Sequence, residues 1–133
     1  MKRWLLDTSA LLTLRDNEPG ADRVAALLAQ AQAGRAVCCG CFMSLMEVYY
    51  RVWKDEGEAA GRLAHEQCLS LPMEWIHESA ELLAAAAEIK AKHPLSLADA
   101  WIAAAARLAG ATLVHKDPEF AAVKLAQEVL PFK

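Results

Sequence analysis

Four acidic side chains stand at a predicted helix start, or within one turn of it, after a strand or a loop. They are Asp7, Glu47, Asp99 and Asp117. Because the carboxyl ends of parallel strands meet at one edge of a sheet, carboxylates far apart in sequence can converge there. Oxygen ligands without histidine or cysteine suit Mg²⁺ or Mn²⁺, and the cation offsets repulsion among the acids. The spacing therefore predicts a divalent metal site that is electrostatically strained without its metal.

Helix capping is the alternative interpretation of each acid taken singly. Ser44 and Glu47 have the spacing of a capping box, and Ser96 with Asp99 nearly repeats it. Asp117 precedes Pro118 as an N-cap precedes a first-turn proline, and Asp7 stands where it can cap its own helix. Capping does not exclude coordination, because a helix N-terminus can hold an acid whose outer oxygen faces a metal.

Strands and helices alternate along the predicted chain. Short apolar runs predict strands at residues 3–6, 36–42, 73–76 and 112–115, with an edge strand at 129–130. Helical periodicity and capping signals predict helices after Asp7, from about 19 to Gly34, at about 44–54 and 56–69, at 79–92, and from Ser96 to Gly110. Strands that are apolar on all sides predict an α/β, three-layer α/β/α sandwich with a mainly parallel sheet of four to five strands.

Composition predicts one globular domain over residues 1–133. Hydrophobic residues make up 56% of the chain and charged residues 23%, which excludes a disordered or collagen-like class. No apolar run reaches the length of a membrane span, and Asp7 and Arg15 interrupt the pattern of a signal peptide. We therefore expect a cytoplasmic protein whose four cysteines are reduced.

Four segments of the sequence together resemble the signature blocks of PIN-domain nucleases, in the same order and over nearly the whole chain. They are Leu5-Leu6-Asp7-Thr8-Ser9-Ala10-Leu11, the helix that carries Glu47, Leu95-Ser96-Leu97-Ala98-Asp99-Ala100-Trp101-Ile102-Ala103-Ala104, and Leu113-Val114-His115-Lys116-Asp117-Pro118-Glu119-Phe120. The small size is most similar to the VapC-type toxins of bacterial toxin-antitoxin pairs. One departure is His115, where such proteins usually carry threonine or serine.

The resemblance implies a Mg²⁺- or Mn²⁺-dependent endoribonuclease that leaves a 5′-phosphate and a 3′-hydroxyl. It assigns Asp7, Glu47, Asp99 and Asp117 as catalytic metal ligands, with Thr8 and Ser9 orienting the first acid and Glu119 at a position that is often acidic. Ser96 supports the site as a helix cap. The implied partners are an RNA substrate, a cognate antitoxin and a second copy of the chain. Metal-activated water needs no side-chain nucleophile, which agrees with the residues present.

Net charge is −3 with a pI near 5.8, so the chain lacks the overall basic character of proteins that coat nucleic acid. When the four acids and Glu119 are set aside, 14 basic side chains remain against 12 acidic ones. This balance allows a mildly basic rim around an acidic centre. The candidate phosphate contacts are Arg51, Lys54 and Lys116, and an ordinary solvated surface is the alternative for each.

Cys38, Cys41, His65 and Cys68 have the spacing of a zinc site. Alternation along a strand sends Cys38 and Cys41 to opposite faces, which favours buried thiols instead. Separately, the Glu47 helix carries more apolar residues than one core-facing stripe needs; these are Tyr49, Tyr50, Val52 and Trp53. A surplus that stays exposed suits a second copy or an antitoxin helix, and core packing is the alternative for at least half of the four.

Two other functions compete with the toxin ribonuclease. The chain is alternatively a catalytically silent PIN-like module that binds RNA or protein, or an unrelated α/β protein whose acids only cap helices. The presence of all four acids favours the nuclease over the silent module. The RNA target depends on loop geometry and RNA shape and is not encoded in a readable motif.

Overall fold

The computed structural model describes residues 1–132 and contains one five-stranded sheet in the order β3-β2-β1-β4-β5. Every neighbouring pair of strands is parallel. The strands are β1 Arg3–Leu6, β2 Val37–Cys41, β3 Glu74–Ile76, β4 Thr112–His115 and β5 Gln127–Val129. The predicted α/β class and parallel sheet are thus confirmed, with five strands.

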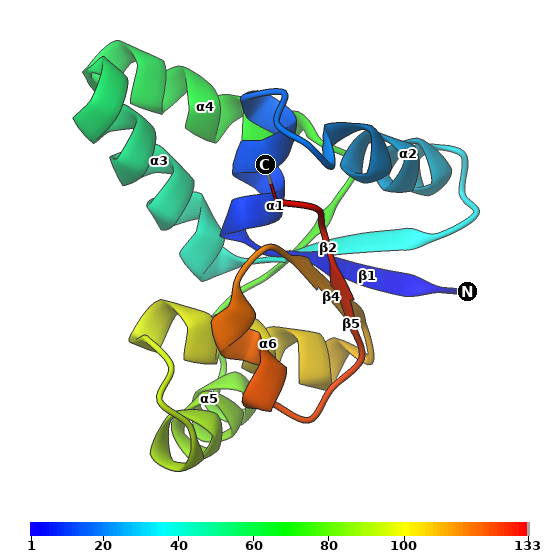
Figure 1. Cartoon of the computed structure of the whole chain (residues 1–133), viewed down its shortest axis with the longest axis vertical. Helices are drawn as coiled ribbons and strands as arrows, with labels where there is room; N and C mark the ends of the chain where they lie inside the picture. Colours follow the sequence, from blue (N-terminus) through cyan, green and yellow to red (C-terminus); the bar gives the residue numbers. More distant parts are fainter. Residues whose placement is uncertain (133) are drawn as a thin grey trace.

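Helices cover both faces of this sheet (Figure 1). They are α1 Thr8–Arg15, α2 Ala21–Gln32, α3 Phe42–Glu56, α4 Glu58–Ser70, α5 Ala80–Lys92, α6 Leu97–Ala109 and the short 3₁₀ helix η1 Pro118–Ala122. The first four helices lie on one face, and α5, α6 and η1 lie on the other. None of the helices in residues 1–132 combines the length and the apolar character that crossing a bilayer requires.

A hydrophobic core lies between the sheet and the helices on each of its two faces. Leu5 and Leu6 are both fully buried, but Leu5 packs on the α5–α6 side and Leu6 on the α1–α4 side, as strand alternation requires. The core on the α5–α6 side is rich in alanine: residues 103–106 of α6 are all inaccessible to solvent. Small side chains allow α6 to pack close to the sheet. This helix therefore has a fixed position relative to β1 and β4.

Most elements differ from their predicted limits by one or two residues, and two differences, in α3 and β5, bear on the site. Helix α3 begins at Phe42, directly after β2, with Cys41 as N-cap and no side-chain cap. The predicted capping box of Ser44 and Glu47 is therefore wrong. Strand β5 spans 127–129, not 129–130. Asp117 caps the 3₁₀ helix η1, with Pro118 in its first turn, as predicted. The helices that start at Asp7 and Ser96 begin as predicted.

The cysteines are free and buried. Cys38 belongs to the core on the α1–α4 side, whereas Cys41 belongs to the core on the α5–α6 side. The zinc constellation is therefore not assembled, because the strand separates its first two ligands. Burial raises the pKa of the Cys41 thiol to about 11. These thiols pack as small hydrophobic groups.

Candidate metal centre

The carboxyl ends of the central strands carry the candidate site. Asp7 follows β1, the middle strand, and Asp117 follows its neighbour β4. Glu47 comes from α3, which leaves the end of β2, and Asp99 comes from the first turn of α6. Four segments that are distant in sequence therefore deliver an acid to one edge of the sheet.

Asp7 is the most buried of these acids, with 3% of its surface exposed. It caps α1: its Oδ1 accepts hydrogen bonds from the Ala10 N–H at 2.8 Å and from the Ser9 hydroxyl at 2.7 Å. Burial, opposed by these two hydrogen bonds and reinforced by the charges of Asp117 and Glu47, raises the Asp7 pKa to about 7. The position is thus costly for an ionised carboxylate that lacks a cation.

Asp99 and Asp117 lie close to each other. Burial raises the pKa of Asp99 to about 7, and a hydrogen bond with the Asp117 carboxyl and the charges of Asp117, Asp7 and Glu47 act in the same direction. Oxygens of Asp99, Asp117 and Glu119 lie within 4.8 Å of one another. The charges of Asp7, Glu47 and Asp117 thus act on Asp99, and Glu119 adds a more exposed carboxylate to the group that Asp99 and Asp117 form.

Thr8 binds a different acid from the one predicted. Its hydroxyl donates to Glu47 Oε1 at 2.6 Å and lies 2.9 Å from the hydroxyl of Ser44, which serves as donor in that contact. The expectation that Thr8 orients Asp7 is wrong on this geometry, because its side chain turns toward α3. Ser9 orients Asp7, as predicted, and its oxygen also accepts the backbone N–H of Lys116 at 3.0 Å.

Two further helix caps lie at the site, one of them Ser96 and the other Asp117. Ser96 accepts the backbone N–H of Asp99 at 3.1 Å, and Asp117 Oδ1 accepts the N–H of Glu119 at 2.9 Å. Capping and convergence thus occur together, as helix N-termini present the acids to one another.

The donor set fits a divalent cation. It consists of carboxylate oxygens, and burial, reinforced by the charges of neighbouring acids, raises the pKa values of Asp7 and Asp99. Hard cations with six oxygen ligands, some of them water, match such a set. Asp99, Asp117 and Glu119 are the acids whose oxygens lie close enough together to hold one, and Asp7 and Glu47 are near enough for their charges to act on Asp99.

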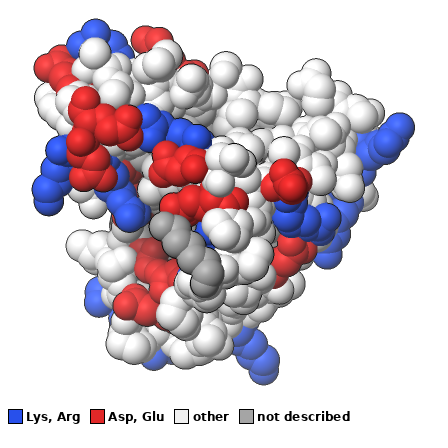
Figure 2. Space-filling model, turned by 45° about the horizontal axis from the view of Figure 1, so that its top comes forward, with Lys and Arg blue, Asp and Glu red and all other residues white. Residues whose placement is uncertain are grey.

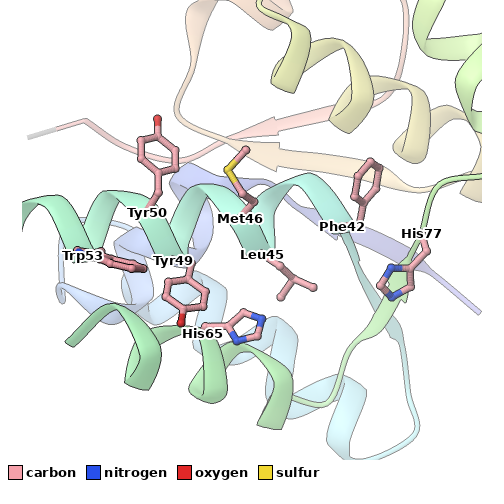
Figure 3. A pocket seen from close by; sticks show the side chains of 8 residues that line it. All are labelled: Phe42, Leu45, Met46, Tyr49, Tyr50, Trp53, His65 and His77. Carbon is pink, nitrogen blue, oxygen red and sulfur yellow. The ribbon is translucent and has the colours of Figure 1, made fainter. Parts of the chain in front are cut away.

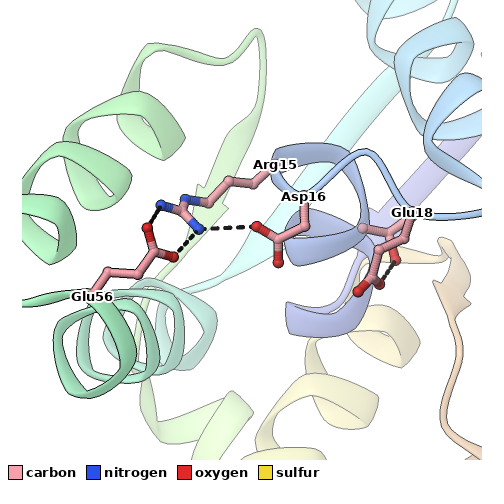
Figure 4. A network of polar contacts seen from close by, with 5 residues as sticks. Arg15, Asp16, Glu18 and Glu56 are labelled. Carbon is pink, nitrogen blue, oxygen red and sulfur yellow. Dashed lines mark hydrogen bonds and ion pairs between the residues drawn. The ribbon is translucent and has the colours of Figure 1, made fainter.

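A polar hollow of about 220 Å³ is lined by Ser9, the residue that donates to Asp7, and by three basic and four acidic side chains: Arg15, Arg51, Lys116, Asp16, Glu18, Asp55 and Glu56. Arg15 is paired with Glu56 at 2.8 Å and with Asp16 at 2.9 Å (Figure 4). Lys116 Nζ lies 3.4 Å from Glu18, with 11% of the side chain exposed. Arg51 has no ion pair within residues 1–132, and Lys54 is outside the lining.

Figure 2 shows one face of the molecule, on which acidic side chains form groups with Lys and Arg side chains around and between them. This distribution agrees with the near balance of charge once the site acids are set aside. The surface presented is mixed, without a continuous basic stripe on that face.

Sequence reasoning missed three residues at the site. Ser44 was assigned to a cap, whereas its hydroxyl contacts Thr8. Glu18 pairs with Lys116, and Gln127 accepts a hydrogen bond from His115 at 2.8 Å. Pairs such as these depend on the three-dimensional arrangement, and no spacing in the sequence predicts them.

The chain was compared with known families and structures. The family model described as PIN domain matches residues 4–125. The curated proteins contain no match to the chain. Solved structures with the same fold include VapBC2 from Rickettsia felis bound to a promoter DNA fragment, at 20% identity and a TM-score of 0.78, covering 97% of this chain and 99% of that one.

Two other solved structures are similar over comparable lengths. DNA-bound VapBC from Salmonella typhimurium shares 20% identity with a TM-score of 0.76, covering 97% of this chain and 98% of the other. VapC20 from Mycobacterium tuberculosis, a toxin that cleaves the sarcin-ricin loop, shares 22% identity with a TM-score of 0.72, covering 96% and 98%. At these identities the likeness establishes the fold. Together with the family match over residues 4–125, it confirms the resemblance seen in the four segments: the chain belongs to the PIN domain family.

Proposed function

We propose that this protein is a Mg²⁺- or Mn²⁺-dependent endoribonuclease and the toxin of a toxin-antitoxin pair. The observation that carries the proposal is the acidic group of Asp99, Asp117 and Glu119, whose oxygens lie within 4.8 Å of one another, with Asp7 and Glu47 near enough to act on the charge of Asp99. Isolated helix caps have no reason to be gathered in this way. Membership of the PIN domain family and the fold shared with VapC toxins support the same activity.

The four acids differ in how hydrogen bonds hold them in place. Asp7, fixed by Ser9 and the α1 N-terminus, and Glu47, fixed by Thr8, are the acids whose oxygens are aimed by hydrogen bonds. Asp99 and Asp117 complete the set. A bound divalent cation supplies a lowered pKa for a water nucleophile and stabilises charge on the scissile phosphate. The products, by similarity to the family, carry a 5′-phosphate and a 3′-hydroxyl.

The polar hollow that Ser9 lines is the place we propose for the RNA backbone. Arg51 is the cation with the greatest freedom to bind phosphate there, because Arg15 and Lys116 already face carboxylates. A phosphate that displaces Glu18 recruits Lys116 as a second contact. Lys54 lies on the same helix but away from this hollow, which makes it the weakest of the three predicted contacts.

We propose that an apolar segment of the antitoxin occupies a groove of about 490 Å³ between α3 and α4 (Figure 3). Met46, Tyr50 and Trp53 line it with 56%, 47% and 46% of their surfaces exposed. Exposed apolar side chains contiguous over two helical turns are typical of an interaction site. Several of the solved structures with this fold are toxin-antitoxin complexes, which supports the class of partner.

The groove is tested by exchanging Trp53 for glutamate and measuring the affinity for the product of the neighbouring reading frame. We expect a loss of at least tenfold, in the range of a buried aromatic anchor. Leu83→Glu is the matched control, since Leu83 is 51% exposed on α5, on the other face of the sheet. If Trp53→Glu leaves that affinity unchanged but abolishes self-association, the groove binds a second copy.

Cleavage of RNA is tested directly with the purified protein. We expect phosphodiester cleavage with Mg²⁺ or Mn²⁺, none in EDTA, and none with Asp99→Asn at any metal concentration. A mixture of structured and single-stranded RNAs is the substrate, because toxins of this kind accept few targets. Cleavage that persists in EDTA would contradict the metal mechanism.

The alternative function is a catalytically silent PIN-like module that binds RNA or protein. It is distinguished by metal binding: a silent module has no need of the cation, so Mn²⁺ would not raise its melting temperature. The intact set of four acids favours the nuclease.

A further inference from the structure

His115 is a buried polar residue that the proposed chemistry does not use. It is the last residue of β4, 1% exposed, and its ring packs at 4.8 Å and 60° against Phe120. Its Nε2 lies 2.8 Å from Gln127 Oε1, and its Nδ1 accepts the backbone N–H of Asp117 at 3.0 Å. Both ring nitrogens are therefore engaged, one by β5 and one by a predicted metal ligand.

The hydrogen-bond pattern fixes which nitrogen carries the proton. Gln127 Nε2 donates to the carbonyl oxygens of Phe120 at 2.8 Å and Val123 at 3.0 Å, so its Oε1 is left as an acceptor. The His115 Nε2 must then be the donor. Because the Asp117 N–H is a donor, Nδ1 must be unprotonated. The neutral tautomer with its proton on Nε2 therefore satisfies every group.

The connection from β4 to η1 is held at each of its amides. The N–H of Lys116 donates to Ser9 Oγ, and that of Asp117 to His115 Nδ1. Pro118 has no N–H, Glu119 donates to Asp117 Oδ1, and Phe120 donates to the Asp117 carbonyl at 3.3 Å. One side of this turn is thus tied to Asp7 through Ser9, and the other side is tied to β5 through His115.

We infer that His115, fixed by Gln127, is a positioning residue that sets the place of the Asp117 carboxylate in the metal centre. The acceptor at Nδ1 determines where the Asp117 backbone lies, and Oδ1 is already committed to the Glu119 amide. The Asp117 carboxylate, held in this way, has an oxygen within 4.8 Å of a carboxylate oxygen of Asp99. Groups that orient a metal ligand commonly change metal affinity by about 10- to 100-fold when they are removed. This inference rests on the proposed function.

The test compares two replacements of the same ring. In His115→Asn the side-chain Oδ1 branches from Cγ where Nδ1 stood and can still accept the Asp117 N–H; in His115→Leu no acceptor remains. Both variants lose the ring and its bond to Gln127. The readouts are the dissociation constant for Mn²⁺, measured by electron paramagnetic resonance, and the melting curve in EDTA, which reports the structural cost separately.

We expect His115→Leu to bind Mn²⁺ about tenfold more weakly than wild type, and His115→Asn to stay within about threefold. Equal Mn²⁺ affinities in the two variants would overturn the inference, whatever their melting temperatures. If wild type itself binds no Mn²⁺, the metal centre and the proposed function fail first, and the inference falls with them.

A variant that does not fold is replaced by a measurement on the wild-type protein. In ¹⁵N-labelled material we expect the Asp117 amide to be protected from hydrogen exchange and the His115 Nδ1 to resonate as an unprotonated nitrogen. An unprotected Asp117 amide, or a proton on Nδ1, would overturn the inference. The effect on metal binding is then measured with Gln127→Leu. We expect this variant to bind Mn²⁺ more weakly, because the His115 ring loses the partner that holds its tautomer.

Discussion

Thr8 Oγ1 lies 2.6 Å from Glu47 Oε1, so the first residue of α1 holds an acid that projects from α3. Two helices that leave neighbouring strands are thereby joined at the candidate metal centre. Thr8 and Ser9 stand side by side in sequence but bind different acids, Glu47 and Asp7.

Replacing Thr8 by valine removes the donor to Glu47 while keeping the shape of the side chain. We expect the free energy of unfolding to fall by about 1 kcal/mol and the Mn²⁺ affinity to fall about tenfold. Thr8→Ser, which retains the hydroxyl, is the control and should bind Mn²⁺ like wild type. Isothermal titration and chemical denaturation measure the two effects; undiminished Mn²⁺ binding by the valine variant would mean that Glu47 needs no orientation.

Replacing Asp99 by asparagine separates a ligand from a cap. Ser96, not Asp99, provides the cap of α6, so the exchange leaves helix capping intact. Because a charge is removed from the cluster, the variant should melt at or above wild type in EDTA. It should lose most of the stabilisation that Mg²⁺ gives wild type, which is about 1.4 kcal/mol at tenfold excess over the dissociation constant. Equal responses to Mg²⁺ in the two proteins would exclude Asp99 as a ligand.

The stability of the metal-free protein should fall as pH rises from about 4 to about 7. Burial raises the pKa of Asp7 from 3.8 to about 7, so the folded protein keeps a proton that the unfolded chain releases near its ordinary pKa. The native state binds more protons across that range, and stability then decreases with pH. Asp99, raised to about 7, acts in the same direction.

Melting curves in EDTA at several pH values measure this slope, with Asp7→Asn as the comparison. The variant lacks one of the two groups, so its melting temperature should decline less between pH of about 4 and 7. Metal affinity should show the opposite trend and rise through pH of about 7, because binding requires the ionised carboxylates. A stability that is flat over this range would contradict the burial of an acid at Asp7.

Arg51 and Lys54 form a matched pair for substrate binding. Both are exposed cations on α3, but only Arg51 lines the polar hollow. Arg51→Ala should raise the KM for a cleavable RNA severalfold with little change in kcat, whereas Lys54→Ala should change neither. Initial rates over a range of RNA concentrations provide the measurement, and equal effects of the two variants would indicate a diffuse electrostatic contribution.

The fold was predictable because its signals are local. Buried apolar runs marked the strands, and the helix that carries Asp99 was marked by the Ser96 cap and by Gly110 at its end. The acids could be grouped because each follows a strand or begins a helix. The fold class follows from such patterns, since parallel strands impose helices between them.

The contacts within the site were not predictable in the same way. Strand β2 runs into α3 without a loop, so Ser44 lies inside the first turn and contacts Thr8 instead of capping the helix. Gln127 begins a short edge strand with weak alternation, and its bond to His115 spans two strands. Such pairs depend on register and rotamer, which a single sequence does not encode in its spacing.

The order of the strands bears on when, during synthesis, the proposed metal centre can form. Asp7 belongs to the first strand–helix unit, whereas Asp117 comes after the fourth strand and is anchored by Gln127 in the fifth. A fragment of the chain that stops before Asp117 carries three of the acids and lacks the turn that presents the fourth. On the ribosome, helices α3 and α4 therefore emerge before the proposed metal centre can form, which requires nearly all of the chain.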